Sequence, residues 1–204
     1  MKGLSNYSNC DFRLSNFSTK IFNKIKFHDS DLRRSSFYNC LIKICEFKNS
    51  RLDKANFNET RLSKCLFLNS IATNMMAEKS FVNDCYIKDT DMTGCLFSNS
   101  KIYKTHFNNS VLTNTQFENS EILSCAFNKI NLFGVSFKGA RLINVIFDNT
   151  DLSYSNFEEA ILENVDFKKS HQHGSNIIKS NSIQSCLGIQ KPLQNKDFNK
   201  WKLD

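Results

Sequence analysis

The side chains in this sequence that could do chemistry form few pairs. The clearest are His171 and His173, which are two residues apart, and the neighbouring carboxylates Glu158 and Glu159. A His-x-His pair can bind a metal weakly, and paired carboxylates can act as general acid and base. The sequence has no Gly-rich phosphate loop, no His-Glu-x-x-His motif and no nucleophile elbow. We therefore expect a protein without catalytic activity, bound metal or cofactor, and we interpret the carboxylate pair as part of a solvated face.

The eight cysteines are the other group that could bind a metal or form disulfides. Seven of them are separated by multiples of five residues, and no two have the Cys-x-x-Cys spacing of zinc and redox motifs. They alternate with Ser, Thr and Ala at one recurring position, where a free Cys packs as a small apolar residue. We expect reduced, buried thiols at Cys10, Cys40, Cys45, Cys65, Cys85, Cys95 and Cys125.

A spacing of five residues governs the rest of the chain as well. From Leu112 to Phe167 a large apolar residue occurs at every fifth position without interruption. Helical faces repeat every 3.6 residues and strand faces every 2.0, so neither structure fits. Each five-residue unit must instead turn a corner and place one large side chain inside. The inward residues of this stretch are Leu112, Phe117, Ile122, Phe127, Leu132, Phe137, Leu142, Phe147, Leu152, Phe157, Leu162 and Phe167.

The neighbours of the large residues complete the pattern. A small residue lies two positions before most of them, and Asp or Asn often comes directly before, as at Asp31, Asn56 and Asp151. Over roughly residues 5–170 the sequence thus resembles the pentapeptide-repeat family, whose consensus is A-(D/N)-L-x-x. The resemblance implies an all-β fold, a right-handed quadrilateral parallel β-helix.

Residues twenty positions apart support a four-sided coil independently. The column from Phe37 to Phe157 and the column from Phe47 to Phe167 are mostly Phe, and the two columns between them are aliphatic. Three sides per turn would mix these columns. About eight coils at a strand spacing of about 4.8 Å predict a rod about 38 Å long.

The pattern also predicts the domain limits. We expect residues 1–170 to form the β-helix and residues 171–204 to form a C-terminal tail or short helix that caps it. At 71–86 the large residues come one position early, which predicts a bulged or kinked coil in preference to a register slip. Within the tail, Pro192 is at a possible first helical position, and Leu193, Asp197 or Phe198, and Trp201 are compatible with one helical face.

Charge is distributed unevenly along the chain, whose net charge is +7. Residues 1–70 contain 13 Lys and Arg against 6 Asp and Glu, whereas residues 142–167 contain six acidic residues and no Lys or Arg. Three candidate surfaces follow from the outward positions. They are a basic face (Arg33, Arg34, Arg51 and Lys54), an acidic partner face (Glu118, Glu158, Glu159 and Glu163) and an apolar partner or dimer stripe (Tyr103, Leu123 and Ile143).

We expect a non-enzymatic rod that binds a protein partner, with a homodimer as a further option. Similar family members protect DNA gyrase from quinolones or toxins by imitating DNA, so gyrase is the most definite candidate. DNA carries one negative charge per about 1.7 Å, however, and this rod is net positive. One alternative is a generic scaffold or secreted bacterial effector. Another, which we rank lower, is binding of nucleic acid or an anionic surface through the basic N-terminal coils.

The location in the cell is also an expectation from the sequence. No run of eighteen apolar residues occurs, and the first eleven residues lack the apolar segment of a signal peptide. We therefore expect no transmembrane segment and a cytoplasmic protein, with secretion as an effector as the alternative.

Overall fold

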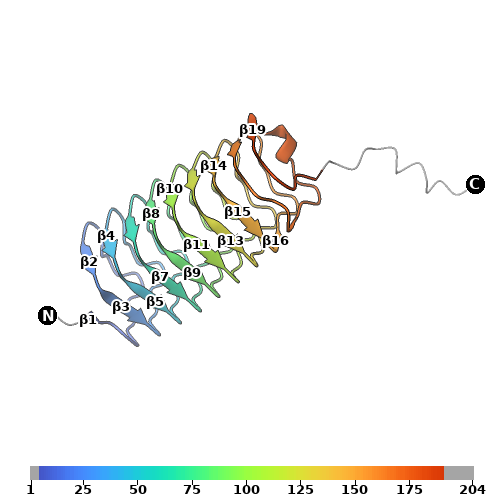
Figure 1. Ribbon diagram of the computed structural model, residues 1–204. Coiled ribbons are helices and arrows are strands. Elements are labelled where there is room, and N and C mark those ends of the chain that lie inside the picture. Colours follow the sequence, from blue (N-terminus) through green and yellow to red (C-terminus); the bar gives the residue numbers. More distant parts are fainter. Residues whose placement is uncertain (1–4, 191–204) are drawn as a thin grey trace, which may run out of the picture.

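The computed structural model describes residues 5–190, which wind into a four-sided rod (Figure 1). Each turn takes twenty residues, because strand partners such as Phe107 and Phe127 are twenty positions apart. Besides β-structure, the described residues contain one short 3-10 helix, η1 (Ile177–Lys179). The expected all-β, quadrilateral parallel β-helix is confirmed.

Two parallel sheets form two adjacent sides of the rod. The eight-stranded sheet contains β1 (Ser5–Asn6), β3 (Ile25–His28), β5 (Glu46–Lys48), β7 (Leu66–Leu68), β9 (Tyr86–Lys88), β11 (His106–Asn108), β13 (Ala126–Asn128) and β15 (Ile146–Asp148). The nine-stranded sheet contains β2 (Ile21–Asn23), β4 (Leu41–Lys43), β6 (Arg61–Ser63), β8 (Phe81–Asn83), β10 (Lys101–Tyr103), β12 (Glu121–Leu123), β14 (Arg141–Ile143), β17 (Ile161–Glu163) and β19 (Ser182–Gln184). A short pair, β16 (Thr150–Asp151) with β18 (Ser170–His171), lies at the C-terminal end.

We name the four sides after their inward residues in one turn, which are Leu52, Phe57, Leu62 and Phe67. The Leu62 side carries the nine-stranded sheet and the Phe67 side the eight-stranded sheet. The Leu52 and Phe57 sides are joined mainly by single parallel bridges between successive turns. Outward side chains therefore form columns whose members are twenty positions apart.

The corners depend on residues with a left-handed backbone. Through Leu162, the residue two positions after each inward residue has a positive φ, for example 52° at Asn49 and 48° at Asn109. Asn tolerates this conformation better than most residues. The Asn49 amide donates to Asp29 Oδ1 at 2.9 Å, and the Asn109 amide donates to Asp89 Oδ1 at 2.6 Å. At these two corners the amides therefore link successive turns and have a structural role.

Stacked phenylalanine rings fill the interior. The centroid of the Phe117 ring lies 5.3 Å from that of Phe97 and 5.2 Å from that of Phe137, as the four-sided prediction requires. Across the core, Phe117 meets Phe127 edge to face at 6.3 Å. Such aromatic pairs contribute stability beyond the area they bury.

The predicted thiol column lies inside the rod. All eight cysteines are free, and Cys45, Cys65 and Cys85 are buried in consecutive turns. Each thiol takes the position where Ser or Thr hydroxyls occur in other turns. The predicted burial is wrong for Cys10, which follows the repeat but is only partly buried in the first described turn, and the eighth cysteine, Cys186, is partly exposed near the C-terminal end.

The turn containing residues 71–86 corrects one expectation, because it is neither bulged nor slipped. Its strands keep unbroken register with the turns on both sides. Ala72 and Ala77 point inward and are completely buried, and Met75 is only 1% exposed. Met75 occupies the small interior position, so its long, flexible side chain fills volume that Leu and Phe fill in other turns. The backbone has no reason to distort.

Stacking continues beyond Ser170, where the repeat pattern ends. The side chain of Gln172 takes an inward position and is 6% exposed. Its Nε2 donates to the carbonyl oxygen of Gly188 at 2.8 Å, and its Oε1 accepts from the backbone N–H of Gln190 at 2.9 Å. A buried amide is tolerated when its hydrogen bonds are made.

The last turn accommodates one extra residue. Ile161 pairs with Ser182, which is twenty-one positions later, and η1 lies in the inserted stretch. The predicted capping helix falls in residues 191–204 and lies outside the described residues. Within residues 5–190, no helix is long and apolar enough to span a bilayer.

Candidate interaction surfaces

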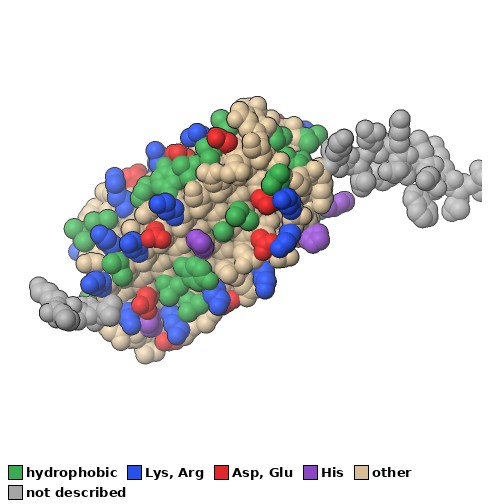
Figure 2. Space-filling view, viewed as in Figure 1, with side chains coloured by type: hydrophobic (Ala, Val, Ile, Leu, Met, Phe, Trp, Pro, Cys, Tyr) green, Lys and Arg blue, Asp and Glu red, His purple; other side chains and the backbone are tan. Residues whose placement is uncertain are grey.

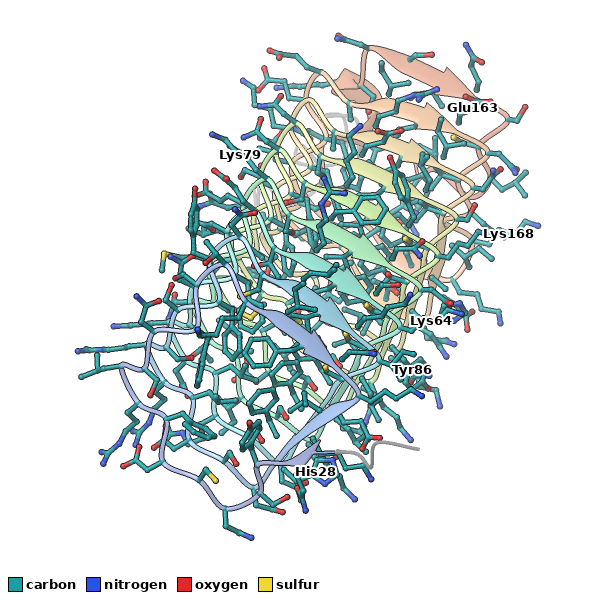
Figure 3. The ribbon with its side chains drawn as sticks, turned by 90° about the vertical axis from the view of Figure 1, so that its left-hand side faces the viewer. His28, Lys64, Lys79, Tyr86, Glu163 and Lys168 are labelled. Carbon is teal, nitrogen blue, oxygen red and sulfur yellow. The ribbon has the colours of Figure 1, made fainter. Side chains whose placement is uncertain are left out.

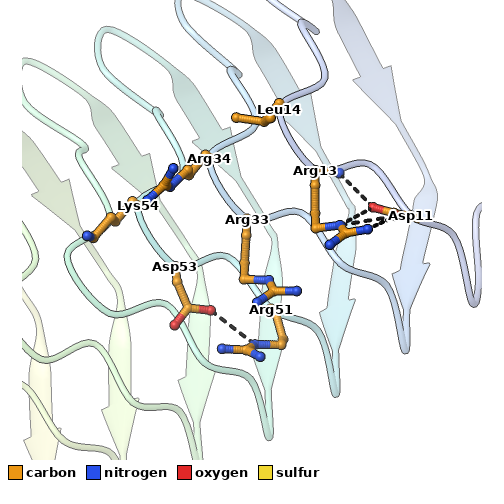
Figure 4. Close-up of a pocket in the computed structure, with 8 residues that line it drawn as sticks. All are labelled: Asp11, Arg13, Leu14, Arg33, Arg34, Arg51, Asp53 and Lys54. Atoms are coloured by element: carbon orange, nitrogen blue, oxygen red, sulfur yellow. Dashed lines mark hydrogen bonds and ion pairs between the residues drawn. The ribbon is translucent and has the colours of Figure 1, made fainter.

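The predicted basic residues lie together on the Leu52 side. Arg33, Arg34, Arg51 and Lys54 come from two successive turns and, with residues of the preceding turn, line a shallow hollow of about 600 Å³ (Figure 4). We call it the arginine hollow. Its complete lining is Asp11, Arg13, Leu14, Arg33, Arg34, Arg51, Asp53 and Lys54.

Carboxylates orient three of the four arginines. Arg13 Nη2 lies 2.6 Å from Asp11 Oδ2, and Arg13 Nε donates to Asp11 Oδ1 at 2.9 Å. Arg33 forms the same fork with Asp31, with Nε 2.8 Å from Oδ1. The Arg13 hydrogen bonds lower the pKa of Asp11 to about 2, and the hydrogen bond from Arg33 lowers the pKa of Asp31. These acids therefore stay ionised at neutral pH.

The other two cationic side chains of the hollow are not held by carboxylates. Arg34 and Lys54 take part in no ion pair among the described residues, and both are exposed. They lie at left-handed corners, with φ of 56° and 57°, in successive turns. Two like charges on one column repel each other across the strand spacing of about 4.8 Å.

The predicted acidic residues do not form one face. Glu118, Glu158 and Glu159 lie on the Phe57 side, whereas Glu163 ends β17 on the Leu62 side and projects outward there (Figure 3). Lys138 Nζ lies 3.2 Å from a carboxylate oxygen of Glu158 and 3.6 Å from one of Glu159. One of these two negative charges is therefore locally neutralised.

Glu118 and the carboxylate pair Glu158 and Glu159 are also accounted for by local contacts. Glu118 Oε1 accepts a hydrogen bond from Ser136 Oγ at 2.9 Å. Glu158 and Glu159 share Lys138, as expected for a solvated face. In the described part of the chain, His171 and His173 belong to no group of three or more His, Cys, Asp or Glu side chains that could hold a metal ion.

The predicted apolar stripe is continuous on the Leu62 side. Tyr103, Leu123 and Ile143 are paired in register on β10, β12 and β14, and all three are half-buried. Phe81 extends the stripe, since its ring lies 5.4 Å from that of Tyr103. Figure 2 shows hydrophobic side chains gathered over β8 and β10. The stripe is therefore larger than the sequence analysis proposed.

A charged column runs beside the stripe. Lys101 Nζ lies 3.7 Å from Glu121, and Arg141 Nη1 lies 3.8 Å from the same carboxylate. Partial burial and a hydrogen bond to Glu121 raise the pKa of Tyr103. An apolar strip bordered by charged groups is the usual composition of a protein interface.

Two exposed clusters were missed by the sequence analysis. Leu66 and Tyr86 are paired in register on β7 and β9, with Leu68 beside them, and a second hydrophobic patch is visible there (Figure 2). On the Leu52 side the ring of Phe133 lies 5.3 Å from that of Tyr154. Arithmetic on columns of twenty residues would have found the first cluster, whereas Phe133 and Tyr154 are twenty-one positions apart and lie in neighbouring columns.

The fold defines a β-solenoid of short repeats, and the comparisons with known families agree. The family model described as "Pentapeptide repeat region" matches residues 100–177, and that described as "Pentapeptide repeats (8 copies)" matches residues 30–69. Together they match more than half of the chain. The chain belongs to the pentapeptide-repeat family.

Solved structures show the same fold at low sequence identity. Full-length QnrB1, a plasmid-mediated fluoroquinolone resistance protein, gives a TM-score of 0.64 at 15% identity and covers 96% of this chain and 97% of its own. Two trypsin-treated QnrB1 variants each give 0.53, at 17% and 16% identity, and cover 90% and 94% of this chain and 91% and 93% of theirs. The comparison with curated proteins found no significant match.

Proposed function

We propose that this protein is a non-catalytic rod that binds a protein partner through the apolar stripe of the Leu62 side. The observation that carries the proposal is the in-register row Tyr103, Leu123 and Ile143 beside the charged column. Successive β-strands hold these side chains at a fixed spacing, so little conformational entropy is lost when a partner binds. The inward positions are packed with side chains, which leaves the outer surface to carry function.

The most definite candidate partner is DNA gyrase. Support comes from the fluoroquinolone resistance of QnrB1, whose fold this chain shares along its whole described length. Imitation of DNA along the whole rod has less support, because the chain carries a net charge of +7 and Lys138 neutralises one of the two negative charges of Glu158 and Glu159. We therefore place the gyrase contact on the Leu62 side.

The test is a DNA supercoiling assay with purified gyrase, a fluoroquinolone and the full chain. We expect the chain to restore supercoiling, and Leu123→Glu to abolish the effect by placing a charge within the stripe. Val111→Glu is the matched control, because Val111 is 39% exposed on the Leu52 side. Far-UV circular dichroism checks that both variants fold.

The outcomes separate the general proposal from the named partner. Protection by the wild type and by Val111→Glu, but not by Leu123→Glu, supports both the stripe as the interface and gyrase as the partner. Loss of protection on changing Glu118, Glu158 and Glu159 to Lys, with Leu123→Glu still active, would move the contact to the Phe57 side. If the wild type gives no protection, gyrase is ruled out, and partner capture compared between wild type and Leu123→Glu then tests the stripe alone.

A further inference from the structure

The arginine hollow carries more positive charge than its own carboxylates neutralise. Five cationic side chains line it, against the carboxylates of Asp11 and Asp53. Asp31 adds one more negative charge through its pair with Arg33. The hollow therefore keeps a net positive charge, and it lies on a different side of the rod from the stripe assigned to the protein partner.

The two cationic side chains that form no ion pair among the described residues, Arg34 and Lys54, lie at one edge of the hollow. The backbone N–H of Arg34 donates to the carbonyl oxygen of Asp53 at 3.0 Å, which fixes Arg34 directly beside Lys54 in the next turn. Figure 4 shows the two side chains in one row with Leu14, while Arg33 lies in the neighbouring row with Arg13 and Asp53, and Arg51 lies beside Arg33 in the row after that. An anion lying between these rows would relieve the repulsion within each.

The side chains favour a particular kind of anion. Arg13 and Arg33 are already forked onto carboxylates, and this fixes the direction of their remaining N–H groups. Guanidinium forks match the oxygens of phosphate, and a phosphate group carries more charge than one carboxylate. A volume of about 600 Å³ is within the usual range of small-ligand sites.

We propose that the arginine hollow binds a ligand with two adjacent phosphate groups, such as a nucleoside diphosphate. One phosphate lies between Arg34 and Lys54, and the other faces the guanidinium groups of Arg33 and Arg51. Leu14, which is 72% exposed at the rim, offers an apolar surface for the nucleoside. A nucleic-acid backbone also presents successive phosphate groups, although a sugar separates them, so the experiment has to distinguish these two sources.

The experiment is isothermal titration calorimetry on the full chain at low and at physiological ionic strength. The probes are inorganic pyrophosphate, ADP, a single-stranded oligonucleotide and an oligoglutamate peptide. The test variant is Arg34→Gln with Lys54→Gln. The control is Lys104→Gln with Lys129→Gln, which removes the same charge from exposed left-handed corners on other sides.

We expect pyrophosphate to bind and the test variant to weaken binding about tenfold or more, because two charge-assisted contacts are lost. The control variant should change the affinity by less than about twofold, since its charges lie beyond the screening length. Thermal unfolding of each variant shows whether the rod remains folded. If the wild type binds ADP more tightly than pyrophosphate, and Leu14→Ala binds the two with equal affinity, the ligand is a free nucleotide.

Tighter binding of the oligonucleotide, with no effect of Leu14→Ala, identifies backbone phosphates and still supports the site. Three results would overturn the proposal: no probe binds at low ionic strength, both double variants weaken binding equally, or oligoglutamate binds as tightly as pyrophosphate. The last result would mean that the hollow recognises acidic protein segments.

Discussion

The rings of Phe107 and Phe127 lie 4.7 Å apart and within 4° of parallel. The same stacking continues to Phe147, at 5.1 Å. It stops in the other direction at Ile87, in the turn where Ala77 interrupts the stack on the opposite side. The aromatic core is thus divided into two parts by a single turn without an inward ring, and that turn depends on Met75.

Replacing Met75 with Ala should destabilise the rod by about 2–5 kcal/mol, the usual range for removing a buried Met side chain. Met75 is 1% exposed and lies beside Ala72 and Ala77, which cannot expand to fill the space. The neighbouring Met76 points outward, so Met76→Ala is the control and should change stability by less than about 0.5 kcal/mol. Urea unfolding measures both, and equal effects would show that Met75 does not fill the core.

Hydrogen exchange should be faster in the turn of residues 71–90 than in the turns next to it. This turn lacks the ring stacking that joins Phe97 to Phe117, although its backbone hydrogen bonds are complete. Local opening requires less free energy where fewer buried contacts are lost. The turn of residues 111–130 is the reference, and equally slow exchange in the two turns would show that Met75 compensates fully for the missing rings.

The columns could be predicted from the sequence because each inward residue is set by its position in the repeat alone. The same arithmetic brought Arg33, Arg34, Arg51 and Lys54 together, since outward positions follow from inward ones. It could not predict that Arg33 pairs with Asp31, because that depends on a choice of side-chain rotamer. These pairings decide which cationic groups of the hollow remain available to bind an anion.

The predictions that the structure corrects failed for specific physical reasons. The bulged coil was predicted because large residues come one position early at 71–86, whereas Met75 fills the space beside Ala72 and Ala77 without any change of register. Glu163 was grouped with Glu158 and Glu159 because they are close in sequence, yet a corner separates them. Beyond Ser170 the pattern ends, because Gln172 replaces an apolar residue by making buried hydrogen bonds and η1 adds one residue to the turn.

Stability should fall as the pH rises from about 9 to about 11. Burial raises the pKa of Cys45 and of Cys125 to about 11. In the unfolded chain a thiol titrates near about 8.5, so between these values the unfolded state binds fewer protons than the folded state. The free energy of unfolding must therefore decrease with pH in this window, whereas the thiols contribute a constant amount below it.

The control for this pH effect uses Ser, which occupies the same interior position in other turns. Cys45→Ser with Cys125→Ser should reduce the slope of unfolding free energy against pH. Urea unfolding in the presence of a reductant, at several pH values, measures the slope. An unchanged slope in the double variant would show that Cys45 and Cys125 do not cause the alkaline effect and would assign it to other groups, among them the buried thiols of Cys40 and Cys95, whose pKa values burial also raises.

Replacing Gly188 with Ala should loosen the last turn more than replacing Gly94 with Ala affects the middle of the rod. Both glycines have left-handed backbones, with φ of +74° and +68°, and Ala in this conformation costs about 1–2 kcal/mol. A Cβ at Gly188 would lie 2.5 Å from the Lys168 Cα and backbone N, which cannot move without breaking the stacking. At Gly94 the contact is the Asn74 amide oxygen at 2.6 Å, and that side chain can rotate away.

Because each turn contacts only its neighbours, the Gly188 effect should stay local. Hydrogen exchange in β19 should become faster in Gly188→Ala while the thermal midpoint of the whole rod changes little. Gly94→Ala should instead lower the midpoint modestly and leave exchange in β19 unchanged. If both variants behave alike, the contact with the Lys168 backbone does not hold the last turn in place, and the strain of the left-handed backbone alone explains the two glycines.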